Sequence, residues 1–404
     1  MTALFEPGTI GSMTVKNRIV RSAFLEMMGT PDGMPTDATL RTYQLLARGG
    51  VGLIITGMAY VSPAGKGQPL QHGADTDAMV PAWRRITDSV HELGGKIAMQ
   101  IVHCGRQANP EALGGMRPVA PSAAPNLYYC TRSRAMTGAE IRRAIDDFGN
   151  AAARVKAAGF DAVQIHGAHG YLVSSFLTPL TNRRRDEWGG DPDRRFRFLA
   201  EVYEEIRRAV GPAFPVLCKL NAHDRFWRGL TPRDSFPAAR RLDEMGLDAL
   251  ELSGGIFENV LYTSRGGVPA DIVALDRNPV FRRLLLAGLG MQRRSYPFEE
   301  AYFEPFAREL KPSLRMPLIL VGGIRTRRAA EAIVANGVAD FVSMARPLVR
   351  EPGLPNKWLR GEADGAQCES CNRCFGEEGR GHPARCYSKA KAARAAGPGE
   401  ASSR

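Results

Sequence analysis

Two histidines, His166 and His169, stand three residues apart in the segment VQIHGAHGYL, directly behind an apolar run. Imidazoles at this spacing could bind a metal ion, polarise a substrate oxygen, or fill hydrogen bonds in a tight turn. A metal site needs a third ligand, usually a carboxylate or another histidine. His103 is the only further histidine at the end of an expected strand, and VHCGR places no acid beside it. We therefore favour recognition of a carbonyl group or an anion.

A glycine pair and an arginine form a second candidate site. Gly322 and Gly323 follow the apolar run LILV and precede the start of a helix, and Arg346 follows the run FVSM with Ala345 between them. Glycines let a ligand approach backbone N–H groups closely, and a guanidinium group offers a planar fork to phosphate oxygens. These residues predict a phosphate site, and the alternative is that the glycines only form a tight turn.

Four cysteines near the C-terminal end form a third group. Cys368, Cys371, Cys374 and Cys386 have the spacing C-x2-C-x2-C-x11-C, whereas the other three cysteines are scattered. Four thiolates at such intervals suit a [4Fe–4S] cluster or a tetrahedral zinc ion. Free thiols are the third alternative.

The elements that position these residues are short apolar strands alternating with amphipathic helices. The expected strands cover 18–23, 52–58, 96–102, 161–166, 215–221, 248–253, 317–323 and 340–345. Helical periodicity over 195–211 and 327–337 ends in glycine in both cases. Eight strand–helix repeats predict an α/β fold, a closed (β/α)8 TIM barrel, with long excursions after the third and sixth strands. An open doubly wound sheet is the alternative, but its Gly-x-Gly-x-x-Gly loop is absent after the first strand.

A barrel of this type places its chemistry at the C-terminal ends of the strands. The polar side chains expected there would therefore converge on one mouth. The strand-end candidates are Ala23 to Glu26, Gly57, Gln100, His103, His166, His169, Lys219, Ser253, Gly254, Gly322, Gly323, Ala345 and Arg346.

Composition narrows the function classes. The chain has 404 residues, a net charge of +12 and a hydrophobic fraction of 44%. Acidic and basic residues alternate, without the basic–aromatic stripe of a nucleic-acid surface, so small anionic ligands are the better expectation. We see no membrane-spanning run and no secretion signal, and we expect a cytoplasmic protein. The expected domains are a barrel over 1–360, a cysteine-rich extension over 361–388 and a disordered tail over 389–404.

Five motifs together resemble the old yellow enzyme family of FMN-dependent barrels. They are NRIVRSA, MQIVHCGRQ, IHGAHGYLVSSFLTPLTNRRRDEWGG, RRFRFLAEV, and LILVGGIRT followed by VSMARPLVREP. The resemblance implies FMN at the barrel mouth, NADH or NADPH as reductant, and reduction of the activated C=C bond of an α,β-unsaturated carbonyl compound. Hydride would come from flavin N5. Multi-cofactor members carry a similar four-cysteine motif after the barrel, which implies a [4Fe–4S] cluster here.

Roles for individual residues follow from the same resemblance. Gln100 matches the side chain at the flavin pyrimidine edge, and Lys219 matches the cation near flavin N1. The phosphate loops are implied for Gly322, Gly323, Ala345 and Arg346, and flavin contacts for Ala23, Phe24, Leu25 and Gly57. Leu25 departs from the family, because the better-known relatives have threonine or cysteine at this position.

The same comparison assigns the two histidines and a tyrosine. His166 and His169 match the pair that hydrogen-bonds the substrate carbonyl, and Tyr171 matches the proton donor to the α-carbon. An amine-oxidising or demethylating flavin dehydrogenase with an external acceptor is the second function, and a non-redox metal-binding adaptor barrel is the third. A small-molecule substrate is expected, without nucleic acid or membrane. A separate electron-transfer partner and a homo-oligomer stay open.

Overall fold

The barrel is formed by eight parallel strands. The structure, a computed structural model, describes residues 2–126, 128–272 and 279–388. The eight strands are β3 (Ile19–Arg21), β4 (Leu53–Ile55), β6 (Ile97–Val102), β11 (Ala162–Gly167), β12 (Val216–Asn221), β13 (Ala249–Ser253), β14 (Leu318–Val321) and β15 (Phe341–Met344). Each pairs with the next, and β15 pairs with β3, which closes the sheet. The predicted (β/α)8 barrel is confirmed, and each observed strand lies within the corresponding expected range to within one residue.

A hairpin closes the bottom of the barrel. Its strands β1 (Gly8–Ile10) and β2 (Met13–Val15) pair in antiparallel register. Ile10, Met13 and Val15 pack against inward-facing residues of the barrel strands, including Val20 and Leu53, in one buried cluster. The bottom is therefore apolar and sealed, which leaves the opposite mouth for chemistry.

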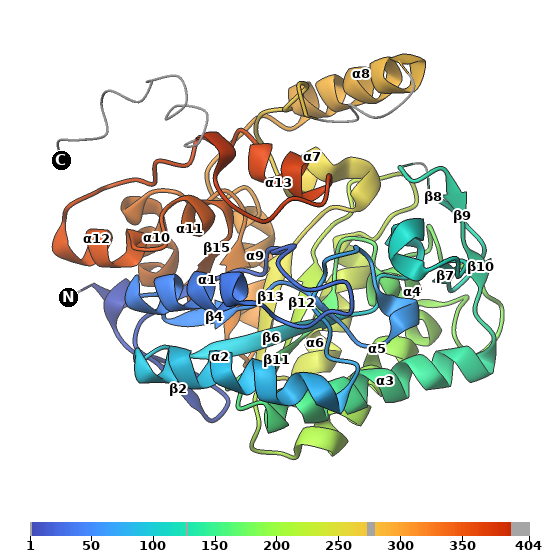
Figure 1. The fold of residues 1–404 in the computed structure, drawn as a ribbon, viewed down its shortest axis with the longest axis horizontal. Coiled ribbons are helices and arrows are strands. Elements are labelled where there is room, and N and C mark those ends of the chain that lie inside the picture. The colour runs from blue at the N-terminus through green and yellow to red at the C-terminus, as the bar shows by residue number, and fades with distance from the viewer. Residues whose placement is uncertain (1, 127, 273–278, 389–404) are drawn as a thin grey trace.

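Helices surround the barrel on its outside (Figure 1). The longer ones are α1 (Asp37–Arg48), α2 (Val80–Glu92), α3 (Gly138–Ala157), α5 (Pro192–Val210), α6 (Pro232–Glu244) and α10 (Arg327–Ala335). Helix α5 begins three residues before its expected start, because the Asp191 side chain caps it by accepting a 2.9 Å hydrogen bond from the N–H of Arg194. Pro192, at the first helical position, needs no N–H partner there.

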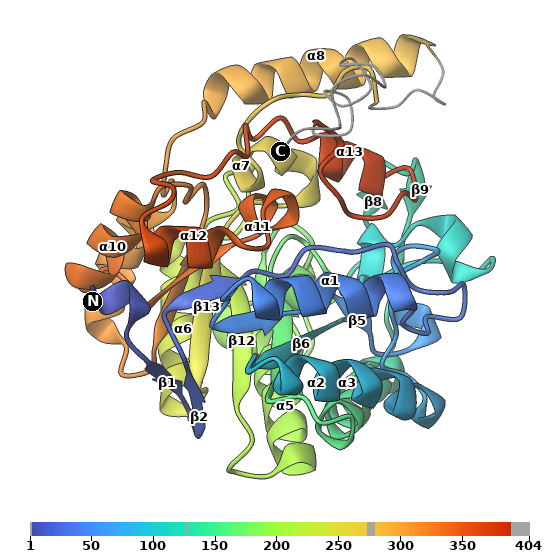
Figure 2. The same ribbon diagram turned by 60° about the vertical axis from the view of Figure 1, so that its left-hand side comes forward.

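The two long excursions begin at the barrel mouth. The first, between β6 and β11, contains η4 (Gly105–Gln107), η5 (Pro110–Leu113), β7 (Val119–Ala120), β8 (Pro125–Asn126), β9 (Thr131–Arg132) and β10 (Arg134–Ala135). The second, between β13 and β14, contains η6 (Phe257–Asn259), α7 (Val260–Thr263), α8 (Pro279–Ser295), α9 (Glu304–Leu310) and η7 (Lys311–Ser313). Helix α8 extends outward from the barrel, and both views show this (Figures 1 and 2).

The remaining elements are short. They are η1 (Ala3–Phe5), β5 (Ala59–Tyr60), η2 (Pro63–Gly65), η3 (Asp77–Met79), α4 (Leu172–Leu177), α11 (Arg346–Arg350), α12 (Leu354–Arg360) and α13 (Arg373–Glu378). Helix α13 belongs to the cysteine-rich segment and lies beside α7, between α8 and the barrel (Figure 2).

The predicted division into domains stays a prediction, and the expected disordered tail over 389–404 lies outside the described residues. Within the described ranges, no helix combines the length and the apolar character that crossing a bilayer requires.

Candidate active site

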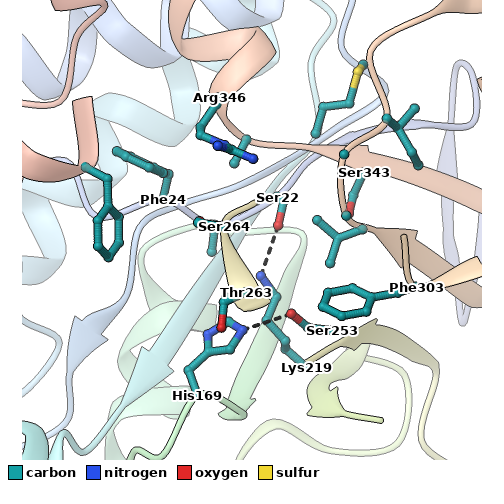
Figure 3. A pocket seen from close by; sticks show the side chains of 18 of the residues that line it. Ser22, Phe24, His169, Lys219, Ser253, Thr263, Ser264, Phe303, Ser343 and Arg346 are labelled. Carbon is teal, nitrogen blue, oxygen red and sulfur yellow. Dashed lines mark hydrogen bonds between the residues drawn. The ribbon is translucent and has the colours of Figure 1, made fainter. Parts of the chain in front are cut away.

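A pocket of about 170 Å³ opens at the C-terminal ends of the barrel strands, and we refer to it as the mouth pocket (Figure 3). All predicted catalytic and flavin-binding residues except Gly57 line it. They are Ala23, Phe24, Leu25, Gln100, His166, His169, Tyr171, Lys219, Gly322, Gly323, Ala345 and Arg346. These residues belong to or follow six of the eight barrel strands, and Ser253, another strand-end candidate that lines the pocket, adds β13 as a seventh.

Gly57 lies just outside this lining. Its N–H donates a 2.9 Å hydrogen bond to Oε1 of the buried Glu26. A Cβ at this position would lie 1.9 Å from Glu26 Oε2, so only glycine fits. The contact with Glu26 explains this glycine.

One end of the pocket has the features of a phosphate site. Gly322 and Gly323 have φ angles of 122° and 76°, which favour glycine. Arg346 lies at the pocket, where its Nη1 donates to the carbonyl of Arg265 at 3.0 Å and to the side chain of Asn372. The arginine is therefore held in place from two sides.

A buried set of six polar residues, which we call the polar layer, forms the floor of the pocket and the level beneath it. Ser22, Gln100, Lys219 and Ser343 line the pocket, and Gln164 and Glu251 lie behind them. Lys219 Nζ lies 3.2 Å from Glu251 Oε2 and donates to Ser22 Oγ at 3.0 Å (Figure 3). Glu251 also accepts hydrogen bonds from Ser22 at 2.6 Å, Ser343 at 2.8 Å and Gln164 at 2.9 Å. Burial alone would raise the pKa of Glu251, but the Lys219 charge and these hydrogen bonds bring it below its usual value. Glu251 is therefore a carboxylate, and its charge opposes the burial that lowers the pKa of Lys219.

The polar layer also fixes the orientation of Gln100. Gln164 Nε2 donates to Glu251, so Gln164 Oε1 is the acceptor for Gln100 Nε2 at 2.7 Å. Gln100 consequently has its carbonyl oxygen available for a donor in the pocket.

The two histidines are neutral. Burial, followed by His169 and Lys219, places the pKa of His166 well below its usual range. Burial, followed by Lys219, lowers the pKa of His169 to about 3. His166 Nδ1 accepts the N–H of Ala168 at 3.3 Å, so the ring proton of His166 resides on Nε2.

His169 is held on both its side chain and its backbone. Its Nε2 lies 2.8 Å from Ser253 Oγ (Figure 3). Its backbone has a φ of 62°, and its N–H donates to Asn221 Oδ1 at 3.3 Å. Asn221 is in turn fixed by Asp224 Oδ1, which accepts a hydrogen bond from its Nδ2 at 2.8 Å. This chain of contacts positions the imidazole.

Tyr171 completes the group. Its ring centroid lies 4.7 Å from that of His166, and burial raises its pKa well above the usual value, so the phenol keeps its proton.

His103, the third histidine considered for a metal, lines neither the mouth pocket nor a second, larger cavity that adjoins it. Its Nδ1 accepts the N–H of Gly105, and burial lowers its pKa to about 4.

A second cavity of about 440 Å³, which we call the outer cavity, adjoins the mouth pocket. The two share the side chains of Leu25, Met58, His169, Tyr171, Thr263, Ser264, Phe375 and Glu378. Aromatic and aliphatic residues of the two excursions and of α13 form much of the remaining wall. A ligand bound over the histidines can therefore extend into a large apolar space.

Some residues of this site had no assigned role in the sequence. Gln164 and Glu251 occupy inward positions of otherwise apolar strands, and this polar interruption was a usable signal. Glu378 comes from α13, far along the chain, and no local pattern indicates that it reaches the active site.

The four C-terminal cysteines line one small cavity of about 20 Å³. All four are free thiols, and Arg350 Nη1 lies 3.5 Å from Cys386 Sγ. Among the described residues, no three His, Cys, Asp or Glu side chains have a metal-binding arrangement. Arg346 and Ser370 line both this cavity and the mouth pocket, so the cysteines adjoin the predicted phosphate end.

The residues present fit FMN. The glycine pair with Arg346 suits the phosphate, the Gln100 carbonyl suits an N–H of the ring edge, and Lys219 supplies a cation for negative charge on the ring. Leu25 lines the pocket and has no hydrogen-bonding side chain.

Comparison with known proteins places the chain among the flavin oxidoreductases. The family model of the NADH:flavin oxidoreductase / NADH oxidase family matches residues 3–257. The NADH oxidase of Thermoanaerobacter brockii is 36% identical over 92% of this chain, and the chain spans 53% of that protein. The 4,4'-dithiodibutanoate disulfide reductase of Rhodococcus erythropolis is 37% identical, with 92% of both chains covered. An old yellow enzyme homologue from Zymomonas mobilis matches with a TM-score of 0.71 and 29% identity, covering 90% of this chain and 94% of its own.

Proposed function

The chain belongs to the NADH:flavin oxidoreductase / NADH oxidase family and is a flavin-dependent oxidoreductase, and we propose that it reduces activated C=C bonds of α,β-unsaturated carbonyl compounds. The observation that carries this proposal is the group of two neutral imidazoles and a protonated phenol around one pocket. FMN, when bound, supplies the hydride that it accepts from NADH or NADPH.

The histidines act on the carbonyl oxygen of the substrate. The Nε2–H of His166 is its only N–H, and Nδ1 is occupied by the backbone amide of Ala168. A hydrogen bond from this donor withdraws electrons from the carbonyl group and makes the β-carbon a better hydride acceptor. His169 lies beside His166 in the same pocket, and its contact with Ser253 holds the orientation of its ring.

Tyr171 protonates the α-carbon. Its phenol lies at the boundary between the two cavities, where burial keeps the proton on the oxygen. A general acid of this kind contributes roughly 10² to 10⁴-fold to a rate.

The test separates the two half-reactions. In Tyr171→Phe, reduction of the bound flavin by NAD(P)H should keep its rate, whereas turnover of enones that require protonation should fall roughly 10² to 10⁴-fold. In His166→Ala/His169→Ala, the yellow cofactor should stay bound and phenols, which mimic the enolate, should no longer bind. Normal phenol binding and enone turnover in the double variant would overturn the assignment.

For the cysteines, we propose a [4Fe–4S] cluster. Support comes from their spacing and from their convergence on one cavity beside the mouth pocket. Anaerobically purified protein should contain iron and absorb broadly near 400 nm beyond the flavin bands. Iron-free anaerobic protein with flavin bands alone would refute the cluster.

A further inference from the structure

Gln107, in the loop after β6, lies at the wall of the outer cavity and has no role in the proposed reaction. Its side chain is almost fully buried, with 3% of its surface exposed. It shares the lining of the cavity with His169 and Tyr171. A buried amide at this place must have hydrogen-bond partners for both of its ends or lose free energy.

The orientation of the Gln107 amide follows from Asn126. The Asn126 Oδ1 accepts two backbone N–H groups, those of Tyr128 and Tyr129, at 3.0 Å each. Its Nδ2 therefore donates, to the carbonyl of Arg106 at 2.8 Å and to Gln107 Oε1 at 3.0 Å. Because Oε1 is the acceptor in this contact, the NH₂ group of Gln107 must occupy the other end of the amide.

This NH₂ group has no hydrogen-bond partner among the described residues. It lies against the backbone of Gly170, since a Cβ on that glycine would be 3.1 Å from Gln107 Nε2. Gly170 joins His169 to Tyr171, so the unused donor lies directly beside the proposed substrate-binding and proton-donating residues. Buried donors are almost always paired, and an unpaired one at a cavity wall points to a ligand acceptor.

We propose that Gln107 binds the substrate through its Nε2–H, which donates to a second oxygen of the molecule whose carbonyl is held by His166. The inference rests on the proposed function and defines its substrate class: a bulky, largely apolar compound with a second, uncharged oxygen acceptor away from the reacting double bond. We expect a bulky, apolar substrate because the outer cavity is large and its lining is mostly apolar.

An uncharged acceptor fits better than a carboxylate. The nearest arginine in sequence, Arg106, is committed to Glu258 in an ion pair with an Nη1–Oε1 distance of 2.5 Å. Arg380, which lines the wall of this cavity, forms an ion pair with Glu377, with 3.6 Å between Nη1 and Oε2. Because both arginines already have a carboxylate partner, transfer of a further carboxylate into these apolar surroundings is more costly than transfer of a ketone, ester or amide.

The test uses phenols as binding probes on the FMN-loaded protein, with the flavin absorbance change as readout. Two phenols that carry an acetyl group, 4'-hydroxyacetophenone on the ring and 4-hydroxybenzylacetone at the end of a two-carbon chain, are called the acylphenols here. They are matched to the alkylphenols 4-ethylphenol and 4-butylphenol, in which a CH2 group replaces the ketone. Wild-type protein is compared with Gln107→Leu, which removes the donor, and with Gln107→Met, which has a side chain of similar length and no N–H donor.

We expect at least one acylphenol to lose about tenfold or more in affinity in both variants, equivalent to about 1.4 kcal/mol, while its alkyl match changes less than about twofold. Equal losses in the acyl and alkyl series, or none in either, would overturn the role of Gln107. If wild-type protein binds no phenol, the proposed function fails instead, so the two failures are distinguishable. Should Gln107→Leu fold poorly, Gln107→Met alone still decides the question.

Discussion

The polar layer at the pocket floor and the outer cavity above it differ in whether their buried polar groups have hydrogen-bond partners. In the layer, Lys219 and Glu251 pair with each other, and serine and glutamine side chains complete the hydrogen bonds of Glu251. In the outer cavity, Gln107 Nε2 and Glu258 Oε2 have no hydrogen-bond partner within the described residues.

We infer from this difference that the polar layer positions a ligand, whereas the outer cavity recognises one. A network whose members hydrogen-bond to one another has one arrangement and presents fixed groups, such as the available Gln100 carbonyl oxygen, to a resident cofactor. Unpaired buried groups cost free energy in the unliganded protein, and a ligand that pairs them recovers it. We therefore assign the cofactor to the floor and substrate selection to the outer cavity.

The largest expected effect comes from breaking the layer. Glu251→Leu leaves Lys219 buried without its counter-charge, and removal of one partner of a buried pair costs about 3–5 kcal/mol. Urea denaturation of the variant should show a loss of that size, together with weaker FMN retention. Glu258→Leu, which removes a carboxylate from the outer cavity, is the matched comparison. It should cost less, because the Glu258 side chain is 16% exposed and that of Glu251 is 0% exposed, so water can reach the Arg106 pair more easily. Equal losses would remove the distinction between the two regions.

An effect of intermediate size is expected from Glu378, on the wall that the two cavities share. Burial, followed by the nearby Glu26, raises its pKa to about 8, against about 4.3 for an unperturbed glutamate. The folded protein therefore holds this proton over a range in which the unfolded chain has lost it. Stability that this group contributes must fall as the pH rises from about 4.3 to about 8.

Glu378→Gln removes that titration. The free energy of unfolding, measured from pH 5 to pH 8.5, should decline less with pH in the variant than in wild type, by on the order of a few kcal/mol over the range. Parallel curves for the two proteins would show that Glu378 titrates normally.

The smallest effect is expected at Ser253, the last residue of β13, whose hydroxyl contacts the His169 ring. Ser253→Ala removes the 2.8 Å contact with Nε2, and a single hydrogen bond of this kind contributes about 0.5–1.5 kcal/mol. Phenol affinity should fall between twofold and about tenfold, with flavin binding unchanged. An unchanged dissociation constant would mean that His169 needs no such support.

The sequence predicted the barrel because eight apolar strands alternate with amphipathic helices, and the strand-end rule then placed the histidines, Lys219 and the glycine pair together. Gly57 shows the limit of that rule, since it is set by a contact with Glu26, which periodicity does not reveal. The unpaired state of Gln107 depends on the orientation of Asn126, and the position of Glu378 depends on the path of the cysteine-rich segment. Such tertiary relationships leave no local pattern.

The most direct test of the account is an anaerobic absorbance titration of the purified protein, first with NADH or NADPH and then with enones. We predict a bound flavin whose absorbance is bleached by at least one of the two coenzymes and restored stoichiometrically by an enone. A protein without flavin, or a reduced flavin that no enone reoxidises but that an amine generates directly, would contradict it.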